Sequence, residues 1–328
     1  MDISVLVLTY NQEDTVGRTL DSVLSQRFDG EFEILLGDDC STDGTRAVCE
    51  RYASRYPDKI RYVRRERNMG VVANYFDCVR QAAGRYIADC AGDDFWVDDL
   101  KLQRQFDLLE SEPDVSMVTT DWLCCDPDGT NIRQHPGHRS VESRQTYEPG
   151  SILVEILTNR IMPHLCSALY RRSIIIEALA QHSEMMEADW LRCEDTQVMM
   201  ALAAAGRVVT LPGVTLHYSL GGESISHRSD FGRRFDHACA SVRQMLMLQK
   251  FYSLDSPELS AVMLRKVEYL WALLFNSSDA ARRPAMLRFE RESGVKTTIK
   301  SKIYRLITSN RLTWRLARFC RAFFSQQR

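Results

Sequence analysis

Short apolar runs alternate with amphipathic stretches along the first 125 residues of the chain. The apolar runs predict buried strands at residues 3–8, 32–36, 60–63, 86–88 and 115–120. The stretches between them carry apolar residues at helical spacing, for example Val16, Leu20, Val23 and Leu24. This order of strands and helices predicts an α/β fold with a mostly parallel sheet covered by helices on both faces.

The pattern changes after residue 125. Residues 126–162 are rich in Pro, Gly, Asn, Arg and His and show little periodicity, which predicts a loop region. Residues 163–228 predict strands near 167–170 and 208–211, with a helix between them. From about residue 230 onward the pattern is helical, and Ser256-Pro257 is typical of a helix start.

The composition is that of a soluble globular protein, with 328 residues of which 45% are apolar and 26% charged. The longest uncharged run, residues 208–222, contains Pro212 and is shorter than a membrane-spanning helix requires. The first residues, MDISVLVLTYNQ, are not typical of a signal peptide. Ten cysteines without a C-x-x-C pair predict reduced thiols. We therefore expect a cytoplasmic protein.

Charge is distributed unevenly along the chain. Residues 293–328 contain nine Lys and Arg and no Asp or Glu, which leaves 33 basic and 44 acidic residues in 1–292. An acidic main body argues against nucleic acid as a partner, because nucleic-acid binding depends on neutralising phosphates. The basic segment has an apolar stripe at helical spacing, made of Leu312, Leu316, Phe319, Cys320, Phe323 and Phe324. It predicts a helix on an anionic membrane, or alternatively one packed on the acidic body.

Polar clusters follow three of the predicted strands: Thr9-Tyr10-Asn11, Asp38-Asp39 and Asp93-Asp94. Ligands of parallel α/β sheets bind at the carboxyl ends of the strands, so we expect these clusters to line one site. The adjacent carboxylates of Asp93 and Asp94 should raise each other's pKa unless a cation compensates. Mg²⁺ or Mn²⁺, bound by one or two carboxylates and diphosphate oxygens, would do so.

Several segments, taken in order, resemble family 2 glycosyltransferases of the GT-A fold. The family's opening strand and helix resemble VLVLTYNQEDTVGRTLDSVLSQ, and its nucleotide-binding segment resembles EILLGDDCSTDGT. The stretch leading into its metal motif resembles NMGVVANYFDCVRQAAGRYIADCAGDDFW, continued by KLQRQFDLLE. Its acceptor-side segment resembles CEDTQVMMALAAAGRVVTLPGVTLHYSLGGESIS. The resemblance covers roughly residues 1–125 and 160–228.

The resemblance implies an inverting enzyme that moves a sugar from a nucleotide diphosphate donor, expected to be a UDP-sugar. The acceptor would be a hydroxyl of a glycan or lipid-linked glycan in the synthesis of cell-envelope polysaccharide. Such acceptors imply a peripheral position on the inner face of the cell membrane, held by the basic segment. Carried over residue by residue, the resemblance assigns the nucleotide to Thr9, Asn11, Glu13 and Asp39, the metal to Asp93, and the general base to Asp195.

Two features complicate this assignment. The family often has an acid two positions before the metal-binding Asp, and this chain has Ala91 there. Asp189-Trp190 precedes Glu194-Asp195, so either Asp189 or Asp195 fits the position of the base. Asp195 is preferred because a helix begins directly after it and Gly206 closes that helix. His217 and His227 are further candidates for contact with the diphosphate or the metal.

Other functions fit less well. A P-loop kinase is excluded because G-x-x-x-x-G-K-[ST] is absent from the sequence. A nucleotidyltransferase would need a Gly-rich, basic first loop, whereas the chain reads YNQED after Thr9. A non-catalytic protein that binds a sugar nucleotide stays as an alternative, because Ala91 replaces an acid that the family often has in its metal motif.

The same patterns predict the division of the chain. We expect a GT-A domain over residues 1–228, with a nucleotide-sugar-binding half at 1–125 and an acceptor-side half at 126–228. A helical extension at 229–292 and a basic amphipathic tail at 293–328 should follow.

Overall fold

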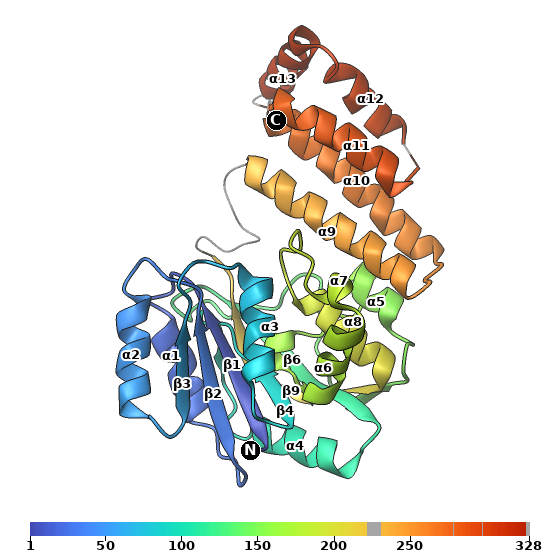
Figure 1. The fold of residues 1–328 in the computed structure, drawn as a ribbon. Helices are drawn as coiled ribbons and strands as arrows, with labels where there is room; N and C mark the ends of the chain where they lie inside the picture. Colours follow the sequence, from blue (N-terminus) through green and yellow to red (C-terminus); the bar gives the residue numbers. More distant parts are fainter. Residues whose placement is uncertain (222–230, 278, 297, 326–328) are drawn as a thin grey trace. The chain divides into compact units, whose positions relative to one another are not determined.

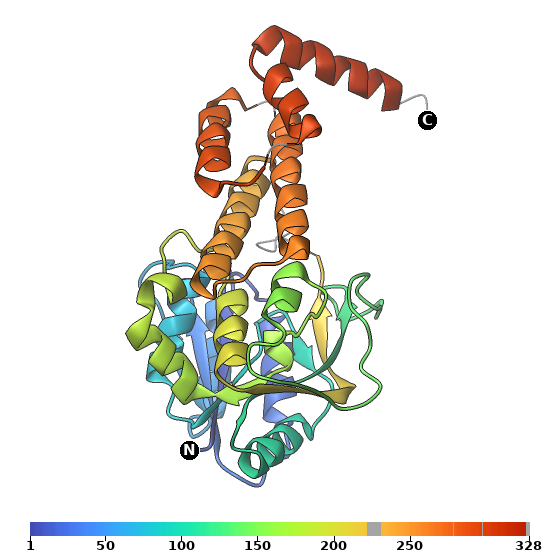
Figure 2. The ribbon, with the colours of Figure 1, turned by 90° about the vertical axis from the view of Figure 1, so that its right-hand side faces the viewer.

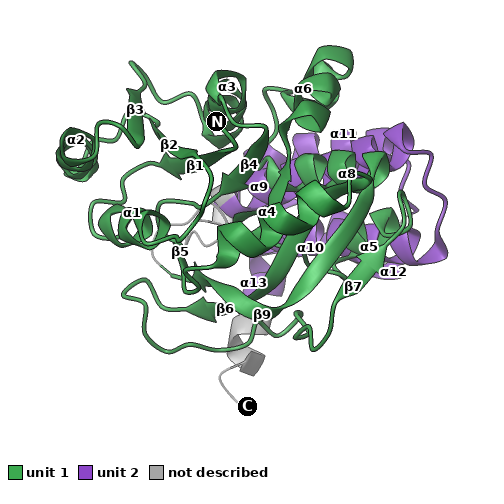
Figure 3. Ribbon diagram, turned by 90° about the horizontal axis from the view of Figure 1, so that it is seen from below, with its two compact units in different colours: residues 1–222 green, residues 223–328 purple. Residues whose placement is uncertain are grey.

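The computed structural model describes residues 1–221, 231–277, 279–296 and 298–325 (Figure 1). The chain divides into two compact units, residues 1–222 and residues 223–328 (Figure 3). The predicted segments 229–292 and 293–328 both lie in the second unit.

A single mixed sheet organises the described part of the first unit. Its strands lie in the order β3 (Ile60–Arg64), β2 (Phe32–Asp38), β1 (Ile3–Thr9), β4 (Tyr86–Asp89), β8 (Leu169–Arg171), β6 (Val115–Cys125), β9 (Arg207–Ser219) and β5 (Phe95–Trp96). The short strand β7 (Gln145–Tyr147) pairs with β9.

Most of these strands run in one direction. Strands β1 to β4 are parallel to one another, and β6 is parallel to β9. Strand β8 is antiparallel to both β4 and β6, so the two parallel groups share a direction. Strands β5 and β7 run antiparallel to β9. The predicted α/β class and mostly parallel sheet are confirmed.

Helices cover both faces of the sheet, and the central strands are therefore buried on both sides. Alternate residues of β1, Ile3, Val5 and Val7, share a core with α1 (Val16–Leu24), α2 (Thr45–Arg55) and α4 (Lys101–Ser111). The opposite face is covered by α3 (Val71–Gln81), which packs on α6 (Arg172–Gln181), and α6 in turn packs on α8 (Asp195–Ala205). Figure 3 shows α3 and α6 on one side of the strands and α1 on the other.

The prediction of a loop region at 126–162 is wrong in two places. Strand β7 and helix α5 (Leu153–Thr158) form within it. Both elements are too short to show a period in the sequence, and tertiary contacts stabilise them: β7 pairs with β9, and α5 packs on α8. The short elements η1 (Leu165–Ser167) and α7 (Ser183–Met186) complete this half of the unit.

The second unit is helical, as predicted. It contains α9 (Phe231–Phe251), α10 (Pro257–Ser277), η2 (Ala280–Arg282), α11 (Arg283–Ser293), α12 (Ile299–Ile307) and α13 (Arg311–Ser325). Helices α9 and α10 lie side by side (Figure 2). Residues of α10, such as Leu270, Trp271 and Leu274, form a core of their own with Phe235 and Trp314. Among the described residues, no helix has both the length and the apolar character needed to cross a membrane.

Candidate functional site

The loops after β1, β2 and β4 meet at one edge of the sheet because β1 lies between the other two strands. The backbone of Asp39 donates to Thr9 O at 3.0 Å, and Gly92 N donates to Leu8 O at 2.8 Å. A side chain at Gly92 would collide with its neighbours, since a Cβ there would lie 2.9 Å from Thr9 Oγ1. The predicted polar clusters therefore lie together, as the parallel sheet requires.

Thr9 contributes an unpaired group to this edge. Its side chain is buried, and Oγ1 has no hydrogen-bond partner among the described residues. Buried hydroxyls are nearly always paired in folded proteins, so an unpaired one facing the loops marks a position where a ligand or water is expected.

Asn11 and Glu13 hold the loop that leads into α2. The Asn11 side-chain oxygen accepts a hydrogen bond from Thr42 N at 2.8 Å, and Glu13 Oε2 accepts one from Gly44 N at 2.6 Å. Asn11 also has a left-handed backbone with φ of 53°, a conformation that Asn tolerates better than most residues. These contacts fix the loop beside the predicted nucleotide site. Direct contact of Asn11 or Glu13 with a nucleotide stays a prediction.

Asp38 and Asp39 end β2 with well-satisfied carboxylates. Asp38 Oδ1 accepts from Ser41 N at 2.9 Å, and its Oδ2 accepts from Tyr62 Oη at 2.9 Å. Asp39 accepts from Met69 N at 2.7 Å and Gly70 N at 2.9 Å, one bond to each oxygen. Each Asp39 oxygen keeps a second lone pair, so the carboxylate can still accept a bond from a ribose or base, as the sequence predicts.

Asp93 and Asp94 follow β4, and only Asp94 has a buried carboxylate oxygen without a partner among the described residues. Burial raises the pKa of Asp93, against the opposing effects of hydrogen bonds and of the Arg18 charge. Burial and the charge of Asp93 raise the pKa of Asp94 well above its usual range. Asp94 Oδ1 accepts from Ser219 N at 2.9 Å, whereas Oδ2 is buried with no hydrogen-bond partner among the described residues.

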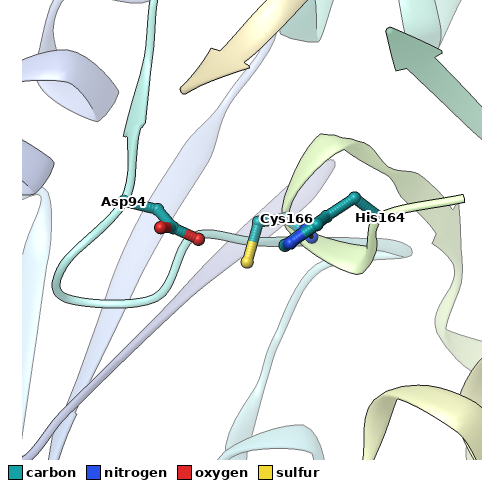
Figure 4. A group of neighbouring side chains, drawn as sticks. All are labelled: Asp94, His164 and Cys166. Carbon is teal, nitrogen blue, oxygen red and sulfur yellow. Dashed lines mark hydrogen bonds between the residues drawn. The ribbon is translucent and has the colours of Figure 1, made fainter. Parts of the chain in front are cut away.

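A possible ligand set for a cation surrounds Asp94. Its carboxylate lies with His164 and Cys166, and the ligand atoms of all three are within 4.8 Å of one another (Figure 4). Burial lowers the pKa of His164 to about 4, so its imidazole is neutral, as a metal ligand must be. Burial raises the pKa of the Cys166 thiol, and a protonated thiol is a poor ligand for a hard cation.

The predicted Mn²⁺ or Mg²⁺ fits this environment. A cation would relieve the repulsion between Asp93 and Asp94 and would supply the partner that Asp94 Oδ2 lacks. Within this group Asp94 and His164 are the residues suited to hold it, and the part that the sequence assigns to Asp93 stays a prediction. Ala91 is half-buried against the apolar core and contributes no ligand from the same loop.

Asp195, at the start of α8, belongs to the same electrostatic cluster. Burial raises the pKa of Asp195 to about 6. The Asp195 charge in turn raises the pKa values of Asp94 and of its neighbour Glu194, whose Oε2 is buried without a partner among the described residues. Asp189, the alternative base, is exposed on the preceding loop. A carboxylate with a pKa near neutrality is suited to accept a proton.

Sequence reasoning missed two residues near Asp93 and Asp94. Arg18 of α1 donates to the backbone oxygens of Asp93 at 3.3 Å and Pro127 at 3.0 Å, and its guanidinium stacks 4.2 Å from the Phe95 ring. It is the positive charge that opposes the raised pKa of Asp93. His164 was missed as well, since a single His in a loop carries no periodic signal.

Of the two histidines predicted to contact the diphosphate or the metal, one lies among the described residues. His217 lies on β9, packs edge-on against Phe95 at 5.2 Å, and has a pKa lowered by burial and by Arg18. Its Nδ1 is buried without a partner among the described residues, so it stays a candidate for ligand contact. His227 lies outside the described residues.

Comparison with known proteins gives the family. Residues 4–179, more than half of the chain, match the family described as Glycosyl transferase family 2. The chain belongs to glycosyl transferase family 2. The family predicted from the sequence is thereby confirmed.

Relatives of this family 2 chain are known from several bacteria. An uncharacterized protein of Mycobacterium tuberculosis is 29% identical over 232 residues, which cover 71% of this chain and 62% of that protein. The putative glycosyltransferase EpsE of Bacillus subtilis is 35% identical over 127 residues, 39% of this chain and 45% of EpsE. The Escherichia coli enzyme WfaP, a UDP-Glc:alpha-D-GlcNAc-diphosphoundecaprenol beta-1,3-glucosyltransferase, is 31% identical over 110 residues, 34% of this chain and 42% of WfaP. The matched regions thus span less than two thirds of these relatives.

Solved structures support the fold. Staphylococcus aureus TarS 1–349, in complex with UDP-GlcNAc, aligns with a TM-score of 0.61 at 16% identity, covering 97% of this chain and 92% of the TarS 1–349 chain. The mannosyltransferase PcManGT of Pyrobaculum calidifontis, in complex with GDP-Man and Mn²⁺, aligns with a TM-score of 0.50 at 17% identity, covering 96% of this chain and 86% of PcManGT. The similarity extends to the helical C-terminal part, since both alignments cover nearly the whole chain.

Proposed function

We propose that this protein transfers a sugar from a nucleotide diphosphate donor to a hydroxyl of a glycan or lipid-linked glycan, with inversion at the anomeric carbon. The observation that carries the proposal is that the charge of Asp195 acts on the buried carboxylate of Asp94, which follows Asp93 in the loop after β4. A cation-binding group and a proton acceptor are the two functions that this transfer requires.

In this reaction Asp195 takes the proton of the acceptor hydroxyl as that oxygen attacks the anomeric carbon. Its raised pKa makes it a stronger base than an exposed carboxylate, and it is still mostly ionised at neutral pH. With one base and no covalent nucleophile, the displacement is single and the configuration inverts. A divalent cation held at the acids after β4 would offset the charge that develops on the leaving diphosphate.

Asp39 and the unpaired Thr9 hydroxyl are assigned to the nucleotide. Both are buried at the carboxyl ends of neighbouring strands, and both keep free acceptor or donor capacity. We assign a UDP-sugar as the donor, in line with TarS bound to UDP-GlcNAc and with the UDP-glucose-dependent WfaP. PcManGT bound to GDP-Man and Mn²⁺ supports the metal assignment and makes GDP-mannose the competing donor.

We propose a lipid-linked glycan as the acceptor. WfaP acts on a diphosphoundecaprenol-linked sugar, which supports an acceptor of this kind for the present chain. The putative teichuronic acid glycosyltransferase TuaG of Bacillus subtilis supports a role in surface polysaccharide synthesis. Such an acceptor places the protein peripherally on the inner face of the membrane.

A thermal-shift screen of UDP-sugars and GDP-mannose, with Mn²⁺ or with EDTA, tests the donor. A ligand at 100 times its Kd should stabilise the protein by roughly 2.7 kcal/mol. Hydrolysis of the stabilising donor then separates an active enzyme from a non-catalytic binding protein, which would bind the donor and leave it intact.

Asp195→Asn and Asp189→Asn form a matched pair for the base, since both remove one charge within the same short stretch. Removal of a positioned base costs ~10²–10⁴ in rate, so Asp195→Asn should lose transfer and keep donor binding. Asp189→Asn should behave as the unmodified protein, because Asp189 is exposed outside the cluster. The opposite pattern would reassign the base to Asp189.

A further inference from the structure

The last two helices of the second unit carry the same surface pattern. Each has three large apolar side chains at positions i, i+4 and i+7, which lie on one helical face. These are Ile299, Ile303 and Leu306 on α12, and Leu312, Leu316 and Phe319 on α13. We call these six residues the outer apolar stripes.

The opposite faces of both helices are attached to α10. On α12 the Tyr304 ring lies 5.5 Å from the ring of Phe275. On α13 the Trp314 indole nitrogen donates to the backbone oxygen of Phe275 at 2.9 Å, and Trp314 is only 4% exposed. Because inner and outer residues lie on opposite sides of each helix, this attachment directs the outer apolar stripes away from the core of the unit.

The outer apolar stripes are strongly exposed. Ile299 is 79% exposed, Leu306 73% and Phe319 71%, and the other three members exceed 50%. Large apolar side chains repeated on adjacent helices are uncommon on a free surface and indicate contact with a partner.

The positive charge around the outer apolar stripes restricts the kind of partner that can bind them. Lys302, Arg311, Arg315 and Arg318 are exposed on the same helices, and none forms an ion pair with a described residue. Lys300 and Arg305 have only long contacts of 3.8 and 3.9 Å with Glu268 and Glu290. Residues 293–328 contain no acid, so a second copy of this surface would be repelled, and the partner must be anionic.

We propose that the outer faces of α12 and α13 dock on an anionic lipid bilayer. Apolar side chains without a shaped pocket, bordered by unpaired arginines and lysines, suit the boundary between acyl chains and anionic headgroups. The docking goes beyond sugar transfer and depends on it only in that a lipid-linked acceptor would lie at the same surface. The two proposals fail separately, because docking is measured without any donor sugar.

Sedimentation of the full chain with liposomes tests the docking. The probes are phosphatidylcholine vesicles and vesicles of phosphatidylcholine mixed with phosphatidylglycerol, each at low and high salt. The protein should pellet with the phosphatidylglycerol vesicles at low salt, release at high salt, and stay in the supernatant with phosphatidylcholine alone.

Matched charge variants locate the surface. Each positive charge near an anionic membrane is worth about fivefold in affinity, so Arg311→Gln, Arg315→Gln and Arg318→Gln together should weaken binding on the order of a hundredfold. The control carries Arg46→Gln, Arg51→Gln and Arg55→Gln on α2, which change the net charge equally and should leave binding unchanged. Leu312→Ser, Leu316→Ser and Phe319→Ser together test the apolar stripe and should also weaken binding. Circular dichroism and thermal unfolding check that each variant is folded.

Three results would overturn the proposal. The unmodified protein could stay in the supernatant with phosphatidylglycerol vesicles at low salt, as expected if the acidic body covers the stripes. The α2 control could lose as much binding as the α13 variant, which would indicate attraction by net charge alone. The protein could be a dimer that the Leu312, Leu316 and Phe319 substitutions dissociate, which would assign the stripes to a second copy.

Discussion

The two pairs of adjacent aspartates at the sheet edge look alike in the sequence and differ in the structure. Asp38 and Asp39 accept hydrogen bonds from Ser41, Tyr62, Met69 and Gly70 through their carboxylates. Asp93 and Asp94 lie beside each other with raised pKa values, and Asp94 Oδ2 has no partner among the described residues. All four carboxylate oxygens of the first pair accept hydrogen bonds, whereas one oxygen of the second pair accepts none from the described residues.

This difference separates aspartates that stabilise the loops from aspartates that are suited to catalysis. Hydrogen bonds from backbone N–H groups stabilise a carboxylate and fix the loop that supplies them, as Asp39 fixes residues 69 and 70. A buried cluster with uncompensated charge lowers stability and is retained where a ligand or a proton completes it. The acids near β4 and α8 are therefore expected to control turnover, and those after β2 to control binding and stability.

The largest effect is expected from loss of the cation. Asp93→Ala, or removal of divalent cations with EDTA, should reduce transfer by about a thousandfold, because a metal ion contributes several kcal/mol of charge stabilisation. Asp128→Ala, which removes an exposed acid from a nearby loop, is the control. The rates are measured with a saturating donor, with and without added Mn²⁺. An unchanged rate in Asp93→Ala or in EDTA would show that the chemistry does not need the metal.

Asp39→Ala should weaken nucleotide binding about ten- to a hundredfold, since a hydrogen bond to a charged group is worth ~1.5–3 kcal/mol. The variant also releases two backbone donors, so its thermal stability is measured beside its affinity by isothermal titration. Asp43→Ala removes an acid from the following turn and serves as the control. Equal losses of affinity in both variants would indicate that the shape of the loop, and not contact with Asp39, determines binding.

The pH profile probes Asp195. Its pKa is about 6, and only the ionised form accepts a proton, so kcat should fall about tenfold per pH unit below pH 6 and level off above it. A bound cation would move the inflection to lower pH, because positive charge favours the carboxylate. The residual activity of Asp195→Asn should lack this inflection. An inflection that survives in Asp195→Asn belongs to another group.

The smallest effect concerns stability. Burial raises the pKa of Asp89 to about 8 from an unfolded value near 4, so the stability associated with its protonated form is present below pH 4 and lost as the pH rises toward 8. Asp89→Asn keeps an acceptor for the Tyr170 hydroxyl and should raise the unfolding temperature at pH 8 by a few degrees, with less gain at pH 5. Asp38→Asn should lower it at both pH values because it loses acceptors for Ser41 and Tyr62. A loss of stability in Asp89→Asn at pH 8 would mean that its charge is compensated.

The sequence by itself determined the strand and helix order, the family, and the location of the polar clusters. These features are local: apolar periodicity decides whether a segment is a strand or a helix, and the carboxyl ends of parallel strands must meet at one edge. The strands at 3–8, 32–36 and 60–63 consequently agree with β1, β2 and β3 to within two residues. The strand ends selected Asp39 and Asp93 as residues of interest, and the resemblance to the family selected Asp195.

Tertiary structure alone decided which acids are compensated and which are not. The donors to Asp39 come from 30 and 31 residues away, and His164 reaches Asp94 from a separate part of the chain. The insertion of β8 between β4 and β6, and the pairing of β7 with β9, also depend on contacts between distant segments. Burial and charge compensation depend on the neighbours that folding brings together, so two aspartate pairs of the same sequence acquire different electrostatic environments.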